Sequence, residues 1–148
     1  MLSTTLLLLA FASPSSPDVK KEDKSPRIPM LQEKPDLSGY YTCKGKEAGG
    51  KEYSGIVVLS KKNEVYVMQW VVGGGSNFTG IAIRQGDQLA ASWAIPNDKG
   101  QIVRGINLYR IESTSNGPRL VGRWASLPGP GVQQEEILLF LKKLEADD

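Results

Sequence analysis

From residue 37 to the end of the chain, short runs of β-branched and aromatic residues alternate with clusters of Gly, Asn, Asp and Pro. Runs of this kind, bounded by turn residues, are typical of β-strands. The pattern predicts eight strands, at about 38–44, 53–60, 64–72, 77–84, 88–94, 102–111, 119–125 and 134–143. Most of the intervening turns have the length of a hairpin loop, so we expect consecutive strands to pair antiparallel as a meander.

A sheet of eight short antiparallel strands exposes two unpaired edges unless it closes on itself. An up-and-down barrel removes both edges. We therefore predict that residues 37–148 form one all-β domain, an eight-stranded antiparallel up-and-down meander closed into a small barrel. A two-sheet β-sandwich is the alternative architecture.

The last predicted strand has an ambiguous pattern. Ile137, Leu141 and Leu144 would share one stripe if residues 135–144 formed a helix. The apolar run in the middle of this segment is continuous, however, and the segment follows a series of strands. These two features favour a strand that closes the barrel.

The N-terminal residues have the features of an export signal. The run 6–12 is apolar and short, and it ends in Ala10-Phe11-Ala12, which matches the A-x-A cleavage pattern of signal peptides. A run of this length cannot cross a bilayer, which needs about 20 residues. We predict a signal peptide over 1–12, export to the periplasm or the extracellular space, and no transmembrane segment in the mature chain.

Residues 13–36 separate this signal from the strands. The segment is rich in proline, and its five basic residues are matched by five acidic ones. Such a composition buries too little apolar surface to offset the entropy lost on ordering, so we predict a disordered spacer. The short apolar patch 28–31 is the one part of it that could pack on the domain.

The composition excludes several functions. The chain has no histidine, so it lacks the usual general base and the commonest metal ligand, and its single cysteine cannot form an internal disulfide. We expect Cys43 to be a buried thiol rather than a point of intermolecular pairing. The net charge is +2 and the basic residues are scattered, which argues against a nucleic-acid surface. We predict no catalytic residues, no metal site and no cofactor, and hence a protein that is not an enzyme.

Three tryptophans recur at the same place in three predicted strands, in Tyr66-x-Met68-x-Trp70, Leu89-x-Ala91-x-Trp93 and Leu120-x-Gly122-x-Trp124. Residues two apart share a face of a strand, and alternate strands of a meander run in the same direction. The three tryptophans should therefore meet at one end of the barrel. They either plug the core or, together with Tyr66 and Met68, line a ligand-binding mouth.

Two further patterns concern the barrel wall. A large apolar residue stands two positions before a glycine in Leu37-x-Gly39, Tyr53-x-Gly55, Phe78-x-Gly80 and Leu120-x-Gly122, and strand glycines of this kind permit a bend or a close approach of two backbones. The second and fourth predicted strands are also apolar on both faces. Their outer side should be covered by the spacer or by a partner chain, and homodimerisation is one way to achieve this.

Several of these motifs occur together in one order along residues 38–140: Tyr53-x-Gly55, Tyr66-Val67-Met68-Gln69-Trp70, Phe78-x-Gly80-Ile81-Ala82, Gly86-Asp87-x-Leu89 with Trp93, Tyr109-x-Ile111, and Leu120-x-Gly122-x-Trp124. This order resembles a family of small exported bacterial β-domains, some of which are labelled fibronectin-binding. The meander is more loosely similar to lipocalin and avidin barrels, although their Gly-x-Trp signature lies on the first strand. The first resemblance implies an exported β-rich module.

These observations predict a non-enzymatic, exported binding or interaction module of unidentified ligand, with an unknown protein as one candidate partner. The alternative is a lipocalin-like carrier that holds a small apolar ligand inside the barrel. A large cavity bordered by the tryptophans would favour the carrier, and a filled core with an exposed apolar patch would favour protein interaction.

The export prediction is tested by the N-terminus of the secreted protein. Cleavage after Ala12 would leave a mature chain that begins at Ser13, because the A-x-A motif ends there and Pro14 keeps the following chain extended. N-terminal sequencing of the protein recovered outside the cytoplasm measures this directly. An intact Met1 or Leu2 terminus would contradict export.

Overall fold

The computed structural model describes residues 34–145. The predicted signal peptide and most of the predicted spacer lie outside these residues. Between Lys34 and Glu145 there is no helix with the length and apolarity that a membrane span requires.

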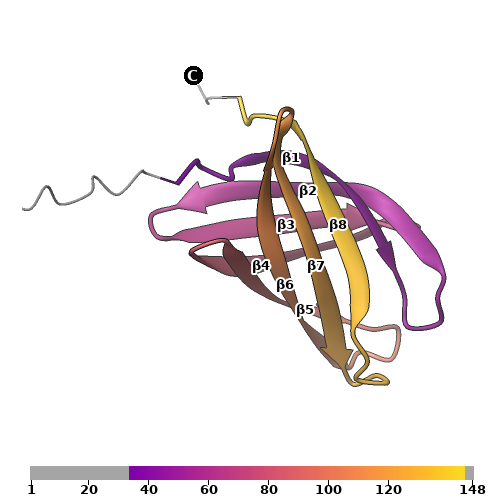
Figure 1. Ribbon diagram of the computed structural model, residues 1–148. Helices are drawn as coiled ribbons and strands as arrows, with labels where there is room; N and C mark the ends of the chain where they lie inside the picture. The colour runs from indigo at the N-terminus through magenta and orange to yellow at the C-terminus, as the bar shows by residue number, and fades with distance from the viewer. Residues whose placement is uncertain (1–33, 146–148) are drawn as a thin grey trace, which may run out of the picture. The chain divides into compact units, whose positions relative to one another are not determined.

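The described chain folds into a closed barrel of eight antiparallel strands, each paired with its neighbours in sequence (Figure 1). The all-β meander and its closure, which the sequence predicted, are confirmed, and the two-sheet sandwich is not the architecture. The strands are β1 (Gly39–Lys46), β2 (Glu52–Lys62), β3 (Val65–Val72), β4 (Ser76–Gln85), β5 (Gln88–Pro96), β6 (Ile102–Thr114), β7 (Gly117–Leu127) and β8 (Gln134–Lys142).

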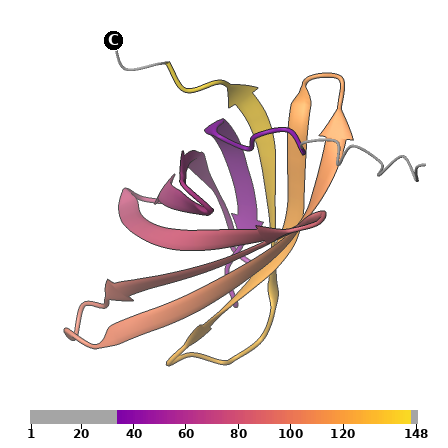
Figure 2. The same ribbon diagram turned by 90° about the vertical axis from the view of Figure 1, so that its left-hand side faces the viewer.

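The last strand closes the barrel by pairing with both β7 and β1. Its residues alternate between the two faces, so that Glu136 and Leu138 are buried while Glu135 and Leu139 are exposed. This alternation selects a strand over the helix that the same sequence could have formed. The strands twist strongly as they pass around the barrel (Figure 2).

Three glycines in the repeated motif lie where neighbouring strands approach most closely. A Cβ atom at Gly55, Gly80 or Gly122 would lie between 2.1 and 2.4 Å from a backbone oxygen of the adjacent strand. Only glycine fits at such a distance, so these positions allow the sheet to coil into a narrow barrel.

One end of the barrel is closed by the residues that precede β1. Leu37 is fully buried there; its N–H donates to Tyr66 Oη at 3.3 Å, and its carbonyl accepts from Tyr41 Oη at 2.7 Å. The last residues of the predicted spacer also contact the barrel, through an ion pair of Lys34 with Asp87 at 3.3 Å. The chain thus covers the end at which β1 begins.

Candidate functional site

The opposite end of the barrel holds the three tryptophans, and we call it the tryptophan end. Trp70 on β3 stacks on Phe78 of β4, with ring centroids 5.2 Å apart, and Phe78 lies 5.0 Å from Trp93 on β5. Trp93 lies 6.2 Å from Trp124 on β7, and Trp124 lies 6.4 Å from Tyr53 on β2. Five aromatic rings from five strands therefore form one continuous cluster. The prediction that the three tryptophans meet at one end of the barrel is confirmed.

Glycines on neighbouring strands make room for these rings. Gly105 is the register partner of Trp93, and a Cβ atom there would lie 2.0 Å from the indole. Gly45 is the register partner of Tyr53, and a Cβ atom there would lie 2.3 Å from the phenol. The rings of Tyr53 and Trp93 therefore pack against the backbone of the neighbouring strand, in the space that a side chain at Gly45 or Gly105 would fill.

A carboxylate is buried beneath the aromatic rings. Glu136 of β8 is only 3% exposed. Its Oε2 accepts a hydrogen bond from Tyr53 Oη at 2.6 Å, and its Oε1 accepts from Trp70 Nε1 at 3.3 Å, from Asn107 Nδ2 at 3.2 Å and from the hydroxyl of Tyr109. Trp70 Nε1 and Asn107 Nδ2 can only donate, so the carboxylate of Glu136 is the acceptor at the centre of this cluster.

Asn107 connects the carboxylate to the remaining rings. This amide is 4% exposed, and its Oδ1 accepts from Trp93 Nε1 at 2.8 Å. Its Nδ2 donates to Tyr109 Oη at 2.7 Å as well as to Glu136. Aromatic side chains and polar groups at this end therefore belong to one hydrogen-bonded network.

In the described part of the chain, the buried carboxylate has no cationic partner. Among residues 34–145, no lysine or arginine nitrogen lies within 4.0 Å of the Glu136 oxygens. The negative charge is held by neutral donors alone. One buried donor of the cluster, Trp124 Nε1, has no hydrogen-bond partner in the described part of the chain.

The network changes the acidity of the groups around it. Burial, together with the charge of Glu136, raises the pKa of Tyr53, of Tyr109 and of the Cys43 thiol well above their ordinary values. Cys43 is 1% exposed, so the prediction that it is buried is confirmed. A thiol with a raised pKa stays protonated near neutral pH and is a poor nucleophile.

Two of the predicted site residues lie away from the tryptophan end. Met68 is fully buried in the middle of the core. Tyr66 is at the opposite end, where its hydroxyl donates to Asp36 Oδ1 at 3.0 Å. The structure therefore brings together Trp70, Trp93 and Trp124, places Tyr66 at the opposite end, and leaves Met68 two residues from Trp70 on the inward face of β3.

Sequence reasoning missed Glu136 and Asn107. Both stand in phase with core residues, Glu136 two positions before Leu138 and Asn107 two positions before Tyr109. A polar residue on the inward face of a strand is the signal that could have identified them.

A second candidate site is an apolar groove on the outside of the barrel. Ile81 and Ile83 on β4 are each 61% exposed, and Ile106 and Leu108 on β6 are 65% and 53% exposed. The register places Ser92 of β5 between Ile81 and Ile106, and the small Ala90 between Ile83 and Leu108. These six residues form what we call the outer groove, with aliphatic walls and a floor of small side chains.

The groove belongs to a broad hollow of about 1190 Å³ lined by residues of β3–β8. The sequence predicted that the second and fourth strands carry apolar residues on both faces, and the exposed Ile81 and Ile83 agree with this for β4. On β2, by contrast, Ile56 and Val58 are half-buried. The apolar surface is therefore centred on β4–β6 and not on β2.

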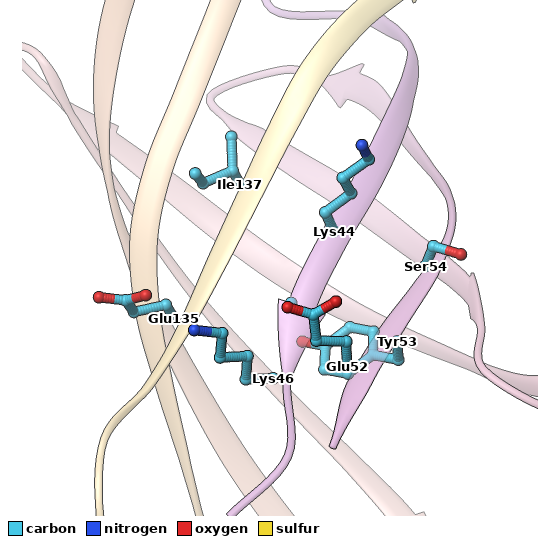
Figure 3. A pocket seen from close by; sticks show the side chains of 8 residues that line it. Lys44, Lys46, Glu52, Tyr53, Ser54, Glu135 and Ile137 are labelled. Carbon is cyan, nitrogen blue, oxygen red and sulfur yellow. The ribbon is translucent and has the colours of Figure 1, made fainter. Parts of the chain in front are cut away.

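A smaller hollow, of about 400 Å³, lies outside β1, β2 and β8 (Figure 3). Its lining carries both signs of charge, from Lys44, Lys46, Glu52 and Glu135. Tyr53 also borders it. Among the described residues no three Cys, Asp or Glu side chains gather in a way that could hold a metal ion.

Comparison of this chain with protein-family models finds no match, and comparison with curated proteins finds none either. The candidate sites therefore rest on the geometry of this chain.

Tyrosine ionisation tests the description of the tryptophan end. A group whose pKa is higher in the folded than in the unfolded chain stabilises the fold below its unfolded pKa, and this stabilisation is lost as the pH rises further. Unfolded tyrosine has a pKa of about 10. We therefore expect stability to fall above about pH 10, with Tyr53 and Tyr109 ionising only as the protein unfolds.

The measurement is phenolate absorbance after a rapid jump to alkaline pH, followed alongside circular dichroism. Tyr109→Phe is the informative variant, because it should remove one slowly ionising phenol. Ionisation of every tyrosine before the circular dichroism changes would contradict the burial of these phenols.

Proposed function

We propose that this protein is an exported, non-enzymatic binding module that takes a protein partner on its outer groove. The observation that carries the proposal is the group of four large aliphatic side chains, Ile81, Ile83, Ile106 and Leu108, each more than half exposed. Contiguous exposed apolar surface on a small domain is typical of an interaction site.

The shape of the groove suits an inserted row of apolar side chains. Neighbouring strands are about 4.8 Å apart, so the two aliphatic walls on β4 and β6 are separated by roughly 10 Å. Ala90 and Ser92 leave the space between them open. A partner that places a ridge of apolar side chains over β5 would bury both walls at once.

The charges around the groove indicate the partner's chemistry. Arg104 and Arg110 stand at the two ends of the exposed row on β6, and Arg123 follows on β7. Within the described residues, Arg104 and Arg123 form no ion pair. An apolar segment flanked by Asp or Glu fits this surface.

The interior of the barrel gives less support to the carrier hypothesis. Its largest fully buried side chains include Trp70, Tyr41, Tyr109, Leu59 and Met68, which fill the core. A carrier of an apolar molecule needs that volume for its ligand.

Export and the absence of catalysis rest on other observations. The apolar run 6–12 and its A-x-A ending support export. The protonated, buried Cys43 and a sequence without histidine offer no activated nucleophile.

Site-specific photo-crosslinking tests the proposal. A benzophenone amino acid is placed at position 106 in the full chain and, as the control, at the exposed outer position 69 of β3. The chain is expressed in the cells that export it. We expect an adduct with another protein from position 106 and not from position 69. Because the partner is acidic, Arg104→Glu should reduce the yield of this adduct by about 10-fold or more.

Two results would contradict the proposal. Adducts that contain only this chain, together with a dimer in sedimentation experiments, would assign the groove to a second copy. The same adducts from positions 69 and 106, unaffected by Arg104→Glu, would remove the groove as a specific site.

A further inference from the structure

The tryptophan end offers a second surface, distinct from the outer groove. Tyr53, Phe78, Trp93 and Trp124 are each half-buried. Trp70 is 1% exposed and lies beneath them. The face of an aromatic ring carries a partial negative charge, which attracts cations.

The buried carboxylate strengthens this attraction. Trp70 and Tyr53 donate hydrogen bonds directly to Glu136, and Trp93 donates to Asn107, which itself donates to Glu136. A ring that donates a hydrogen bond to an anion gains electron density, because hydrogen bonds in a chain polarise one another. Tyr53 and, through Asn107, Trp93 therefore present more negative faces than isolated phenol and indole groups would.

The charge of Glu136 is not balanced by the loops around this end. The β1–β2 loop contains Glu47 and Lys51, and the β5–β6 loop contains Asp98 and Lys99, so that acidic and basic side chains are equal in number there. Neutral donors hold Glu136 itself. A positive ligand over the tryptophan end would thus face several aromatic rings, with the charge of Glu136 buried beneath them.

We propose that the tryptophan end binds a compact organic cation of the alkylammonium type. Such a cation is weakly hydrated, so it loses little hydration free energy when it moves from water to an aromatic surface. Its methyl groups then contact the rings. Because the ring centroids are only 5.0–6.4 Å apart, the ligand lies over the rings and not between them. Each contact of the cation with an exposed ring contributes about 0.5–1 kcal/mol.

Choline and its neutral isostere 3,3-dimethylbutan-1-ol provide the direct test, since they share a shape and differ in charge. The mature chain is titrated with each at constant ionic strength, adjusted with sodium chloride, and the indole N–H resonances of the three tryptophans are followed by NMR. We expect choline to shift the Trp93 and Trp124 resonances saturably. The isostere should bind at least about 10-fold more weakly, because it lacks the charge.

Variants locate the site. Trp124→Leu should weaken choline binding by about 5-fold or more, and it breaks no hydrogen bond, because Trp124 Nε1 has no partner among the described residues. Ile106→Ala, in the outer groove, is the matched control and should leave choline binding unchanged.

Equal binding of choline and its isostere would overturn the proposal, as would a choline titration that shifts no indole resonance in the wild-type chain. The wild-type titration decides the question even if the Trp124 variant fails to fold. Neither result bears on the outer groove, which is tested by crosslinking at position 106.

Discussion

A carboxylate can be buried inside a small barrel only if hydrogen-bond donors surround it, because removing it from water costs several kcal/mol. Glu136 meets this requirement with donors from β2, β3 and β6. Each donor reaches the carboxylate only in one register of the strands. The arrangement of the tryptophan end, including the orientation of Trp70 and, through Asn107, of Trp93, therefore depends on this one buried charge.

The two ends of the barrel differ in consequence. Leu37 and the hydroxyls of Tyr41 and Tyr66 close one end with apolar packing and backbone hydrogen bonds. The other end has a polar network covered by half-buried rings. The exposed aliphatic side chains lie on the outer face of β4–β6 and belong to neither end. The fold thus separates a filled interior from the two surfaces that we propose as binding sites.

The strands and the position of the tryptophans were predictable because they depend on local features. Alternation and turn residues mark each strand, and the direction of strands in a meander brings Trp70, Trp93 and Trp124 to one end. The network was not predictable in the same way. Glu136 and its donor Tyr53 are 83 residues apart, and they meet only because β8 closes on β1. Apolar residues on both faces of β4 indicated one wall of the outer groove. The second wall, on β6, could be placed only once the register of β4, β5 and β6 was known.

The most direct test of the central role of Glu136 is equilibrium unfolding of Glu136→Gln and of Glu135→Gln, its exposed neighbour on β8. Gln cannot accept all four hydrogen bonds, and each bond to a charged group contributes about 1.5–3 kcal/mol. We expect Glu136→Gln to lower the free energy of unfolding by about 3 kcal/mol or more, while Glu135→Gln changes it by no more than about 0.5 kcal/mol. Equal stability of the two variants would contradict the account.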